Sequence, residues 1–135
     1  MMALLWPEGS VEEHRHEADE LLRTSMCGTL PAAIIVAEGK DRSLVGFVQV
    51  GLRSHGDGCD VARAVGFIEG WFVAEPSRGS GIGRALVRAA EAWARANGCV
   101  EMASDALIDN EISHRAHEAL GFEVIDRCVH YRKKL

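Results

Sequence analysis

Near the N-terminus, a stretch with apolar residues at helical spacing begins with a helix-capping motif. Ser10 and Glu13 form the S-x-x-E pattern of a capping box, in which each side chain satisfies a backbone amide of the other residue. We therefore expect a helix from about Val11 to Arg23. Its apolar residues fall on one side, and they are Ala18, Leu21 and Leu22. Because this stripe is narrow, the helix is expected to be peripheral.

Short β-branched runs separated by turn residues follow this helix. Pro31–Ala37 and Leu44–Val50, joined by a polar turn, predict an antiparallel hairpin. Ser54–Asp60 contains glycines and aspartates and is expected to be an exposed loop. Phe67–Val73 predicts another strand, in which Gly70 marks a bulge or a close approach of another segment.

The second half of the chain predicts alternating helices and strands. A helix is expected from Ile82 to a stop at Gly98, with these apolar residues at helical spacing: Ala85, Leu86, Ala89, Ala90 and Trp93. Val100–Ala103 then predicts a short strand, and Asp109–Leu120 a second helix. The inward residues of that helix are expected to be Ile112, Ala116 and Leu120. Val124–Lys133 predicts a closing strand, so the fold class is α+β (α/β), one sheet covered by helices.

Composition and charge narrow the class of protein. The 135 residues fit a single domain spanning 1–135, and 47% hydrophobic with 26% charged residues are typical of a globular chain. Twenty acidic residues against 15 basic ones give a net charge of -5, which repels phosphate backbones and argues against a nucleic-acid partner. No apolar run approaches the ~20 residues that cross a bilayer, and the first residues lack the basic region of an export signal. We therefore expect a cytoplasmic protein without a membrane partner.

The cysteines and histidines form no recognisable metal or redox motif. The cysteines lack any C-x-x-C pair, and they are Cys27, Cys59, Cys99 and Cys128. In a reducing compartment they are expected to be small buried residues. His114 and His117 are an i, i+3 pair without an evident third ligand, so a polar helix face is favoured over a zinc site. No metal is expected.

A glycine-rich segment joins the strand ending at Val73 to the helix opening near Ile82. It reads Arg78-Gly79-Ser80-Gly81-Ile82-Gly83. Glycines let the backbone turn sharply and approach a ligand, and the free amides of a helix start attract phosphate oxygens, so pyrophosphate is the expected ligand. The Lys-Ser/Thr pair of a nucleotide P-loop is absent, and the spacing is not that of the dinucleotide fingerprint. A turn that serves only chain reversal is the alternative.

This segment resembles the coenzyme A loop of the GNAT superfamily of acetyl-CoA-dependent N-acetyltransferases. The family pattern Q/R-x-x-G-x-G/A is matched by Arg78, Gly81 and Gly83. The resemblance implies the GNAT fold, a single mixed sheet flanked by helices, and acetyl-CoA as cosubstrate. It also implies which residues bind the pyrophosphate: Arg78, Gly79, Ser80, Gly81, Ile82, Gly83 and Arg84. The preceding strand is expected to pair with the pantetheine arm through Trp71, Phe72 and Val73.

The resemblance extends to the next helix. Asn110 occupies the position of the family's asparagine that contacts pantetheine, and Gly121-Phe122 matches the Gly-Phe at the helix end. His117 stands where the family has the tyrosine that protonates the departing thiolate. Asn110 and His117 are therefore assigned to the cofactor site by resemblance.

A branch of this superfamily is similar over nearly the whole chain. The matching segments are Gly66–Val73, Ala103-Ser104-Asp105, Ile112-Ser113-His114 and Tyr131–Lys134, and they resemble aminoglycoside 6'-N-acetyltransferases. The resemblance implies acetyl transfer to the 6'-amine of a polycationic aminoglycoside antibiotic, which confers resistance, by direct attack in a ternary complex, and a homodimer. Leu5-Trp6-Pro7 resembles a segment that follows an initial strand in the family, so the first strand is expected to be missing or short.

Two carboxylates are the candidate catalytic residues. Attack of an amine on a thioester requires a base, and a cationic substrate requires acidic partners. Glu69 lies on the strand before the glycine-rich loop and Asp105 follows the next strand, so parallel neighbours bring both to the carboxyl ends of the strands. In the resembling enzymes acids at these positions line the aminoglycoside site, with a base at the position of Glu69 and an ammonium partner at Asp105. From the residues alone, polar side chains facing solvent fit equally well.

Two other functions stay open. One is a GNAT enzyme acting on another amine, such as a polyamine or a protein N-terminus, because a phosphate loop identifies the cofactor and not the acceptor. The other is a non-catalytic acyl-CoA-binding domain, which is favoured by His117 and by the expected absence of the first strand.

Overall fold

The computed structural model describes all residues, 1–135, and divides into two compact units, Met1–Asp105 and Ala106–Leu135. The first unit contains, in order, α1 (Met2–Leu5), α2 (Val11–Thr24), β1 (Met26–Cys27), β2 (Leu30–Glu38), β3 (Leu44–Arg53), β4 (Val65–Val73), the short 3-10 helix η1 (Glu75–Ser77), α3 (Ile82–Ala96) and β5 (Met102–Ser104). The second unit contains α4 (Glu111–Glu118).

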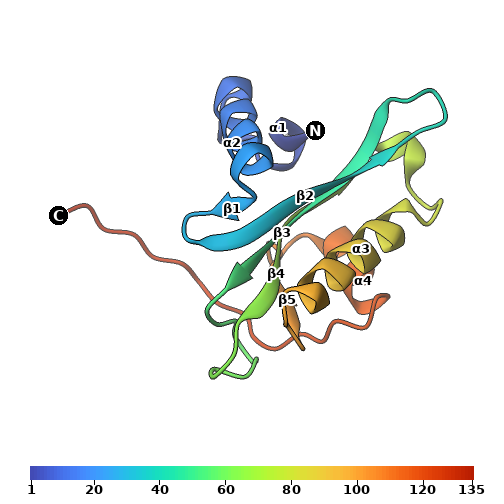
Figure 1. Ribbon diagram of the computed structural model, residues 1–135. Helices are drawn as coiled ribbons and strands as arrows, with labels where there is room; N and C mark the ends of the chain where they lie inside the picture. The colour runs from blue at the N-terminus through green and yellow to red at the C-terminus, as the bar shows by residue number, and fades with distance from the viewer. The chain divides into compact units, whose positions relative to one another are not determined.

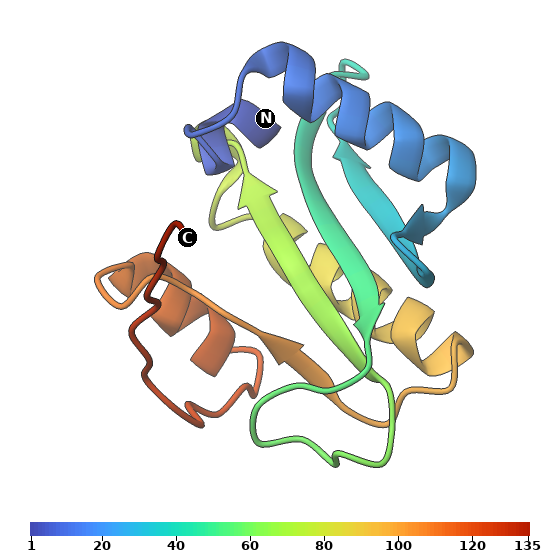
Figure 2. The same ribbon diagram turned by 90° about the vertical axis from the view of Figure 1, so that its left-hand side faces the viewer.

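The first unit is built on one mixed sheet. Its strand order is β1-β2-β3-β4-β5, with antiparallel neighbours throughout except for the parallel pair β4 and β5. Figure 2 shows β3 and β4 side by side along their length. The predicted hairpin and the mixed sheet are confirmed. No strand precedes α1, and the edge strand β1 has only two residues.

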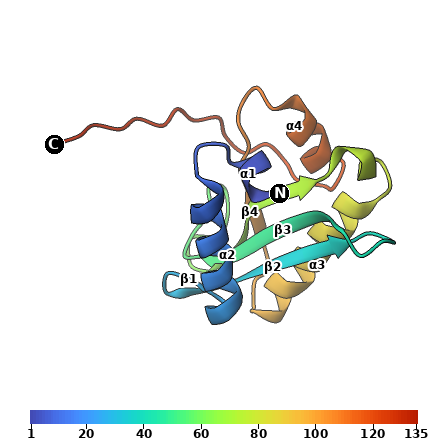
Figure 3. The same cartoon turned by 90° about the horizontal axis from the view of Figure 1, so that it is seen from above.

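Helices cover both faces of this sheet. Figure 1 shows α2 and α3 on opposite sides of it. The predicted helix α3 buries Leu86, Val87, Ala90 and Ala94 against β3 and β4, and the sheet contributes buried residues such as Phe47 and Val50. On the other face α1 packs beside β4, as seen from above in Figure 3. The N-terminal segment therefore lies on the face opposite α3.

The predicted capping box opens α2. The Ser10 side chain accepts a hydrogen bond from the Glu13 amide at 3.1 Å, and Glu13 Oε2 accepts one from the Ser10 amide at 2.8 Å. The hydrogen bonds from the backbone and then the side chain of Ser10 lower the pKa of Glu13. The buried residues of α2 are His14 and Leu21, whereas Leu22 is exposed. The expected apolar face was wrong at Leu22. The covered face of α2 is formed by residues 14, 18 and 21, and residue 22 lies at its edge, turned toward solvent.

Other predicted inward positions also require correction. Ala85 in α3 is exposed, because the face of α3 that meets the sheet includes Val87 instead. Ile112 in α4 is 68% exposed. Ala116 and Leu120 are half-buried as predicted, but the half-buried positions of α4 begin at Ser113 and His114, one residue after Ile112.

The predicted closing strand at Val124–Lys133 is wrong, since residues 122–135 adopt no regular structure. A strand is stable only when its backbone groups pair with a neighbour, and none of the sheet strands pairs with this segment. The expectation of four buried cysteines is also wrong. Cys99 is buried, but Cys27 and Cys128 are exposed because one lies on the edge strand and the other in the irregular tail. Burial raises the pKa of the Cys99 thiol.

Candidate active site

The glycine-rich loop connects η1 to α3 in a conformation that depends on glycine. Gly79 has φ +74° and Gly81, the N-cap of α3, has φ +86°, a region that side chains with a Cβ rarely adopt. The first intrahelical bond of α3 runs from the Ala85 amide to the Gly81 carbonyl. The amides of the first turn of α3 therefore have no intrahelical partner.

Charge and side-chain contacts favour an anion at this helix start. The first turn of α3 has no acidic residue and no side-chain cap, while Arg78 and Arg84 are exposed. Arg78 Nε donates a hydrogen bond to the Val73 carbonyl at 2.9 Å, and the Ser80 hydroxyl donates one to the Ser77 carbonyl at 2.6 Å. These bonds fix the loop between β4 and α3, so that its free amides and the positive end of the helix dipole face the same region.

The strand that leads into this loop carries a bulge at Glu69. In the register of β3 and β4, Val50 pairs with Ile68 and Gln49 pairs with Gly70, which leaves Glu69 as an extra residue of β4. A Cβ added to Gly70 would lie 2.3 Å from the Trp6 ring, so the chain approaches β4 closely at this glycine. The bulge expected at Gly70 lies one residue earlier, at Glu69, and the close approach at Gly70 is made by the side chains of Trp6 and Leu5 rather than by backbone.

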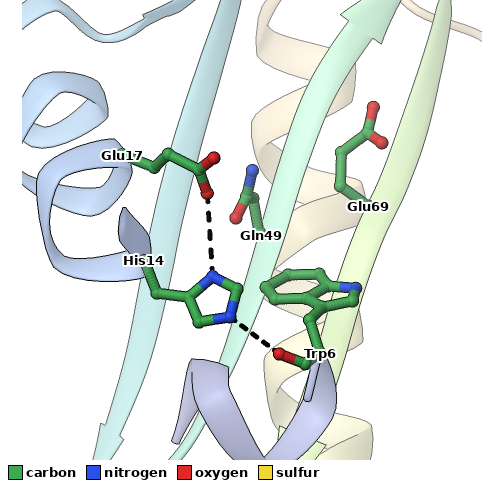
Figure 4. A pocket seen from close by; sticks show the side chains of 5 residues that line it. All are labelled: Trp6, His14, Glu17, Gln49 and Glu69. Carbon is green, nitrogen blue, oxygen red and sulfur yellow. Dashed lines mark hydrogen bonds and ion pairs between the residues drawn. The ribbon is translucent and has the colours of Figure 1, made fainter. Parts of the chain in front are cut away.

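A pocket of about 280 Å³ opens on the bulged part of the sheet. Its lining residues come from α1–α2, β3 and β4, and they are Trp6, His14, Glu17, Gln49 and Glu69 (Figure 4). Two carboxylates, an amide and an indole face this space. Such a set binds an ammonium group through the carboxylates and the apolar face of a ring through the indole.

Arg53 at the end of β3 holds Glu69 in place. Its Nε and Nη2 donate hydrogen bonds to Glu69 Oε1 and Oε2 at 2.9 and 2.6 Å. The guanidinium lies 3.3 Å from the centre of the Phe67 ring, so it is also fixed by a cation–π contact. The Glu69 side chain is 25% exposed and still lines the pocket. Glu69 is therefore already in a bidentate ion pair with Arg53. A proton or a substrate ammonium group that binds Glu69 must either displace Arg53 or bind alongside it.

Trp6 forms one wall of the pocket and is packed on three sides. Its ring centre lies 6.1 Å from that of Phe47 and 6.2 Å from that of His14. His14 Nε2 lies 2.7 Å from the Trp6 carbonyl oxygen and donates to it. The indole is thus positioned by α2 on one side and by the sheet on the other.

Asp105 follows β5 directly. The register pairs Ile68 with Ser104, so Glu69 and Asp105 are the next residues of two parallel neighbours. The structure therefore places the two predicted carboxylates level with each other on neighbouring strands, but only Asp105 lies at a carboxyl end, because β4 continues from Glu69 to Val73. Asp105 is exposed and is not among the residues that line the pocket beside Glu69.

The remaining predicted residues of the cofactor site lie along β4 and in the second unit. Trp71 is half-buried, and a Cβ on Gly83 would lie 2.9 Å from its ring, so the indole packs on the start of α3. Pairing of β4 with β5 covers only Gly66–Ile68, whereas β3 pairs with β4 as far as Val73. The part of β4 that contains Trp71, Phe72 and Val73 thus has no β5 partner.

In the second unit, Asn110 and His117 lie at the two ends of α4. The Asn110 side chain caps the helix by accepting a hydrogen bond from the Ser113 amide at 3.1 Å. His117 Nδ1 lies 2.8 Å from the Ser113 carbonyl oxygen and donates to it, and the ring meets Phe122 edge-on at 5.3 Å. Both side chains thus have defined roles within their own helix.

Comparison with known proteins decides the family. The model of the acetyltransferase (GNAT) family matches residues 1–122. The chain belongs to the GNAT family. The first unit and α4 are therefore parts of a GNAT acetyltransferase fold.

Relatives within this family share one name. The chain is 39% identical to an aminoglycoside N(6')-acetyltransferase type 1 of Klebsiella aerogenes, over 100% of this chain and 87% of the relative. It is 40% identical to a protein of the same name from Serratia marcescens, over 97% and 86%. The solved structure of AAC(6')-Iy with the bisubstrate analog CoA-S-monomethyl-acetylneamine superposes with a TM-score of 0.88 at 34% identity, covering 100% of this chain and 88% of that one.

Neither a membrane span nor a metal cluster stands out in this GNAT chain. None of its helices has the length and apolar character needed to cross a bilayer. No group of three or more His, Cys, Asp or Glu side chains is arranged to hold a metal ion.

Sequence reasoning missed most of the pocket. Arg53, Gln49 and Glu17 were not expected in the site, and Trp6 was noted only as part of a similar segment. His14 carried a usable signal, because residues 14, 18 and 21 follow the helical spacing i, i+4, i+7 and a histidine on that stripe must be buried. Arg53 had no such signal, since its contact with Glu69 spans 16 residues and depends on the strand register.

Proposed function

We propose that this GNAT enzyme transfers an acetyl group from acetyl-CoA to the 6'-amine of an aminoglycoside antibiotic and so confers resistance. The observation that carries the proposal is the carboxylate-lined pocket on β4, the strand that continues into the anion-binding loop of α3. One strand thus links an ammonium-binding pocket to a pyrophosphate site. The relatives named above carry this activity in their names.

Acetyl-CoA is held by the loop at the start of α3. The amides of Gly81, Ile82, Gly83 and Arg84 bind the pyrophosphate, with Arg78, Gly79 and Ser80 shaping the loop. Trp71, Phe72 and Val73 run beside the pantetheine arm, since this part of β4 has no β5 partner. The complexes of AAC(6')-Iy with CoA, which match this chain at 35% identity and a TM-score of 0.84, support this assignment.

The cofactor assignment is tested by substituting Gly81 with Trp. The indole would fill the space that the pyrophosphate needs, so binding of acetyl-CoA in calorimetry is expected to be lost. Gly98→Trp is the matched control, because Gly98 ends the same helix, has φ +85° and, like Gly81, has open space around its Cβ position. Equal affinity in Gly81→Trp and Gly98→Trp would contradict the assignment.

The acceptor amine is deprotonated and oriented by carboxylates. Glu69 serves as base, directly or through a water, and Asp105 holds an ammonium group of the polycation. The net charge of -5 favours the approach of such a substrate. The neutral amine attacks the thioester carbon, the tetrahedral intermediate collapses, and the thiolate of CoA departs. A backbone amide near Trp71 or Phe72 stabilises the oxyanion.

Asn110 and His117 are proposed to complete the cofactor site. Asn110 contacts pantetheine as well as capping α4. Because His117 donates Nδ1–H to the Ser113 carbonyl, a proton on Nε2 makes the ring cationic and able to protonate the departing thiolate. No cysteine is required, and transfer is direct within a ternary complex.

We further propose a single GNAT domain over residues 1–135, which acts in the cytoplasm as a homodimer. The match of the family model to residues 1–122, which spans both units, supports the single domain. Size-exclusion chromatography with light scattering tests the dimer.

The reaction is tested by following free thiol released from acetyl-CoA with four acceptors: kanamycin, kanamycin lacking the 6'-amine, spermine and a peptide. Release that requires the 6'-amine is the expected result. Release with spermine or peptide alone would replace the aminoglycoside by another amine, to which a carboxylate pocket is also suited. Binding of acetyl-CoA without release from any acceptor would leave a non-catalytic acyl-CoA-binding domain.

A further inference from the structure

His14 is a buried titratable residue that the proposed chemistry does not use. The residue is 9% exposed, and its side chain lines the pocket beside Glu69 (Figure 4). Its Nδ1 is buried and makes no hydrogen bond. An unpaired buried acceptor or donor is costly, so its retention in a pocket calls for a function.

The contacts of the ring determine which nitrogen carries the proton. Nε2 lies 2.7 Å from the Trp6 carbonyl oxygen, which only accepts, so Nε2 must be the donor. In the neutral ring Nδ1 is then an acceptor. The nearest charged atom to Nδ1 is Glu17 Oε2 at 3.8 Å, three residues along the same helix.

The ring is held rigidly in this orientation. A Cβ on Gly9 would lie 2.6 Å from His14 Cε1, so the backbone before α2 packs directly on the imidazole. The Trp6 ring lies at 6.2 Å on another side. The imidazole therefore cannot turn away from Glu17 without moving the segment that carries Trp6.

Glu17, by contrast, is exposed and makes a single ionic contact. Its side chain is 72% exposed, and its only ionic contact is the one with His14. Its counterpart Glu69 is already engaged by both nitrogens of Arg53. Glu17 is thus the pocket carboxylate with room for a substrate ammonium group.

We propose that His14 is a positioning residue for the amine acceptor. Its Nε2–H fixes Trp6 as a wall of the pocket, and its Nδ1 controls whether Glu17 is free to bind a second ammonium group of the substrate. The neutral imidazole leaves Glu17 to the substrate, and the protonated one donates Nδ1–H to Glu17 and withdraws it. This inference rests on the proposed function, because it assumes an acceptor with more than one amine.

Acidic side chains lie near His14 on α2 and β4. Glu17 and Glu13 face it from α2, and the pocket adds Glu69 from β4. The element β3 contributes the neutral Gln49 and the cation Arg53, which is paired with Glu69. A substrate ammonium group and a protonated imidazole would compete for the same Glu17 carboxylate.

The test compares the wild type with His14→Gln and Glu17→Gln between pH 5.5 and pH 8, the range in which an imidazole changes charge. The Gln amide can still donate to the Trp6 carbonyl but does not titrate. Thiol release is read with 4,4'-dithiodipyridine, which reacts at acidic pH, to obtain KM for kanamycin and kcat separately. Calorimetry of kanamycin binding to the CoA complex gives the same comparison without turnover.

The KM of the wild type for kanamycin should rise toward pH 5.5 by about two- to fivefold more than that of the variants. This is the size expected for breaking a partly exposed ion pair. In His14→Gln this extra rise should vanish with kcat at pH 8 retained. In Glu17→Gln, which alters only an exposed side chain, KM should be raised at pH 8 and the extra rise should again be absent. Glu17→Gln keeps the test decisive if His14→Gln does not fold.

Two negative results are distinguishable. A wild-type enzyme that neither acetylates nor binds kanamycin would overturn the proposed function. An active wild type whose KM changes with pH in the same way as that of both variants would overturn the role of His14 while leaving the reaction intact. A loss confined to kcat in His14→Gln would equally contradict a positioning role in acceptor binding.

Discussion

The pocket has two acidic walls, a sheet wall that carries Glu69 and a helix wall that carries Glu17, and these carboxylates are held in different ways. On the sheet side, Glu69 lies on a bulge of β4 and accepts hydrogen bonds on both carboxylate oxygens from Arg53, which stacks on Phe67. On the helix side, Glu17 extends from α2 with 72% of its side chain exposed and with an imidazole nitrogen 3.8 Å away. One carboxylate accepts two hydrogen bonds from its neighbour, and the other is exposed with a single ionic contact.

This difference suits two different tasks. A base must point at one amine with little freedom, because misplacement by even one ångström is costly in rate. A residue that holds remote ammonium groups on substrates of different shape benefits from an adjustable position. We therefore assign chemistry to the sheet wall and adaptation to the acceptor to the helix wall.

The largest effect is expected for Glu69→Gln. Removing a general base lowers kcat by about 10² to 10⁴, while affinity for acetyl-CoA in calorimetry should be unchanged. Glu38→Gln, at the end of β2, is the control for the loss of one negative charge from the sheet. Unchanged kcat in Glu69→Gln would remove this residue as the base and would make the sheet wall merely structural.

The next largest effect is expected for Gly70→Ala, which disturbs the contact between the two walls. The new methyl group would lie 2.3 Å from the Trp6 ring and 2.9 Å from Leu5. Forcing extra volume into a packed contact costs about 1–3 kcal/mol, which corresponds to a decrease of about 5- to 150-fold in kcat/KM if it falls on the acceptor complex. Gly51→Ala is the control in the neighbouring strand, because its Cβ would make ordinary contacts at 3.5 Å and beyond. Equal kcat/KM in the two variants would show that Trp6 is not needed for the acceptor.

The same two walls differ in how far the sequence could predict them. The sheet wall follows from local signals: β-branched runs indicated β2, β3 and β4, and Gly70 indicated an irregularity that the structure places at the adjacent Glu69. The glycines of the loop before α3 indicated a sharp backbone turn, and the structure shows positive φ angles at Gly79 and Gly81. These features depend on residues close in sequence, whose conformational preferences can be evaluated one segment at a time.

The helix wall and the tail depend on tertiary contacts and were predicted poorly. The face of α2 that is covered includes His14, a residue that the apolar stripe did not include, and its partner Trp6 comes from the segment after α1. The alternation at Val124–Lys133 has the period of a strand but no strand of the sheet to pair with. Periodicity reports which face of a segment is apolar and does not report whether a neighbour exists.

A smaller effect is expected for Arg53→Gln, which loosens the sheet wall without removing its carboxylate. Both ion-pair partners are partly exposed, at 43% and 25%, so the loss should be modest, about fivefold in kcat/KM. Arg53→Lys keeps the charge but not the bidentate geometry, and should fall between the wild type and Arg53→Gln. A higher kcat/KM in Arg53→Gln would mean that Arg53 competes with the substrate for Glu69 instead of orienting it.

The smallest effect on activity is expected for Ser10→Ala, which weakens the N-terminal cap of α2, the helix that carries Glu17. Loss of an N-cap side chain costs about 1 kcal/mol of stability, measured here by urea unfolding at pH 7. Kcat should stay unchanged because neither Ser10 nor Glu13 lines the pocket.

The cost of Ser10→Ala should depend on pH in a definite direction. The pKa of Glu13 is lowered in the folded chain by the hydrogen bonds from the backbone and side chain of Ser10, relative to an ordinary value of 4.5. Stability from the ionised carboxylate is thus present above that value and is lost as pH falls through the lower, folded-state pKa. Ser10→Ala keeps the backbone amide that donates to Glu13 and loses only the side-chain hydrogen bond, so the difference between wild type and Ser10→Ala should shrink modestly on acidification below 4.5. A difference that grows toward acid would show that the capping box stabilises α2 through the protonated form of Glu13, contrary to its observed hydrogen bonds.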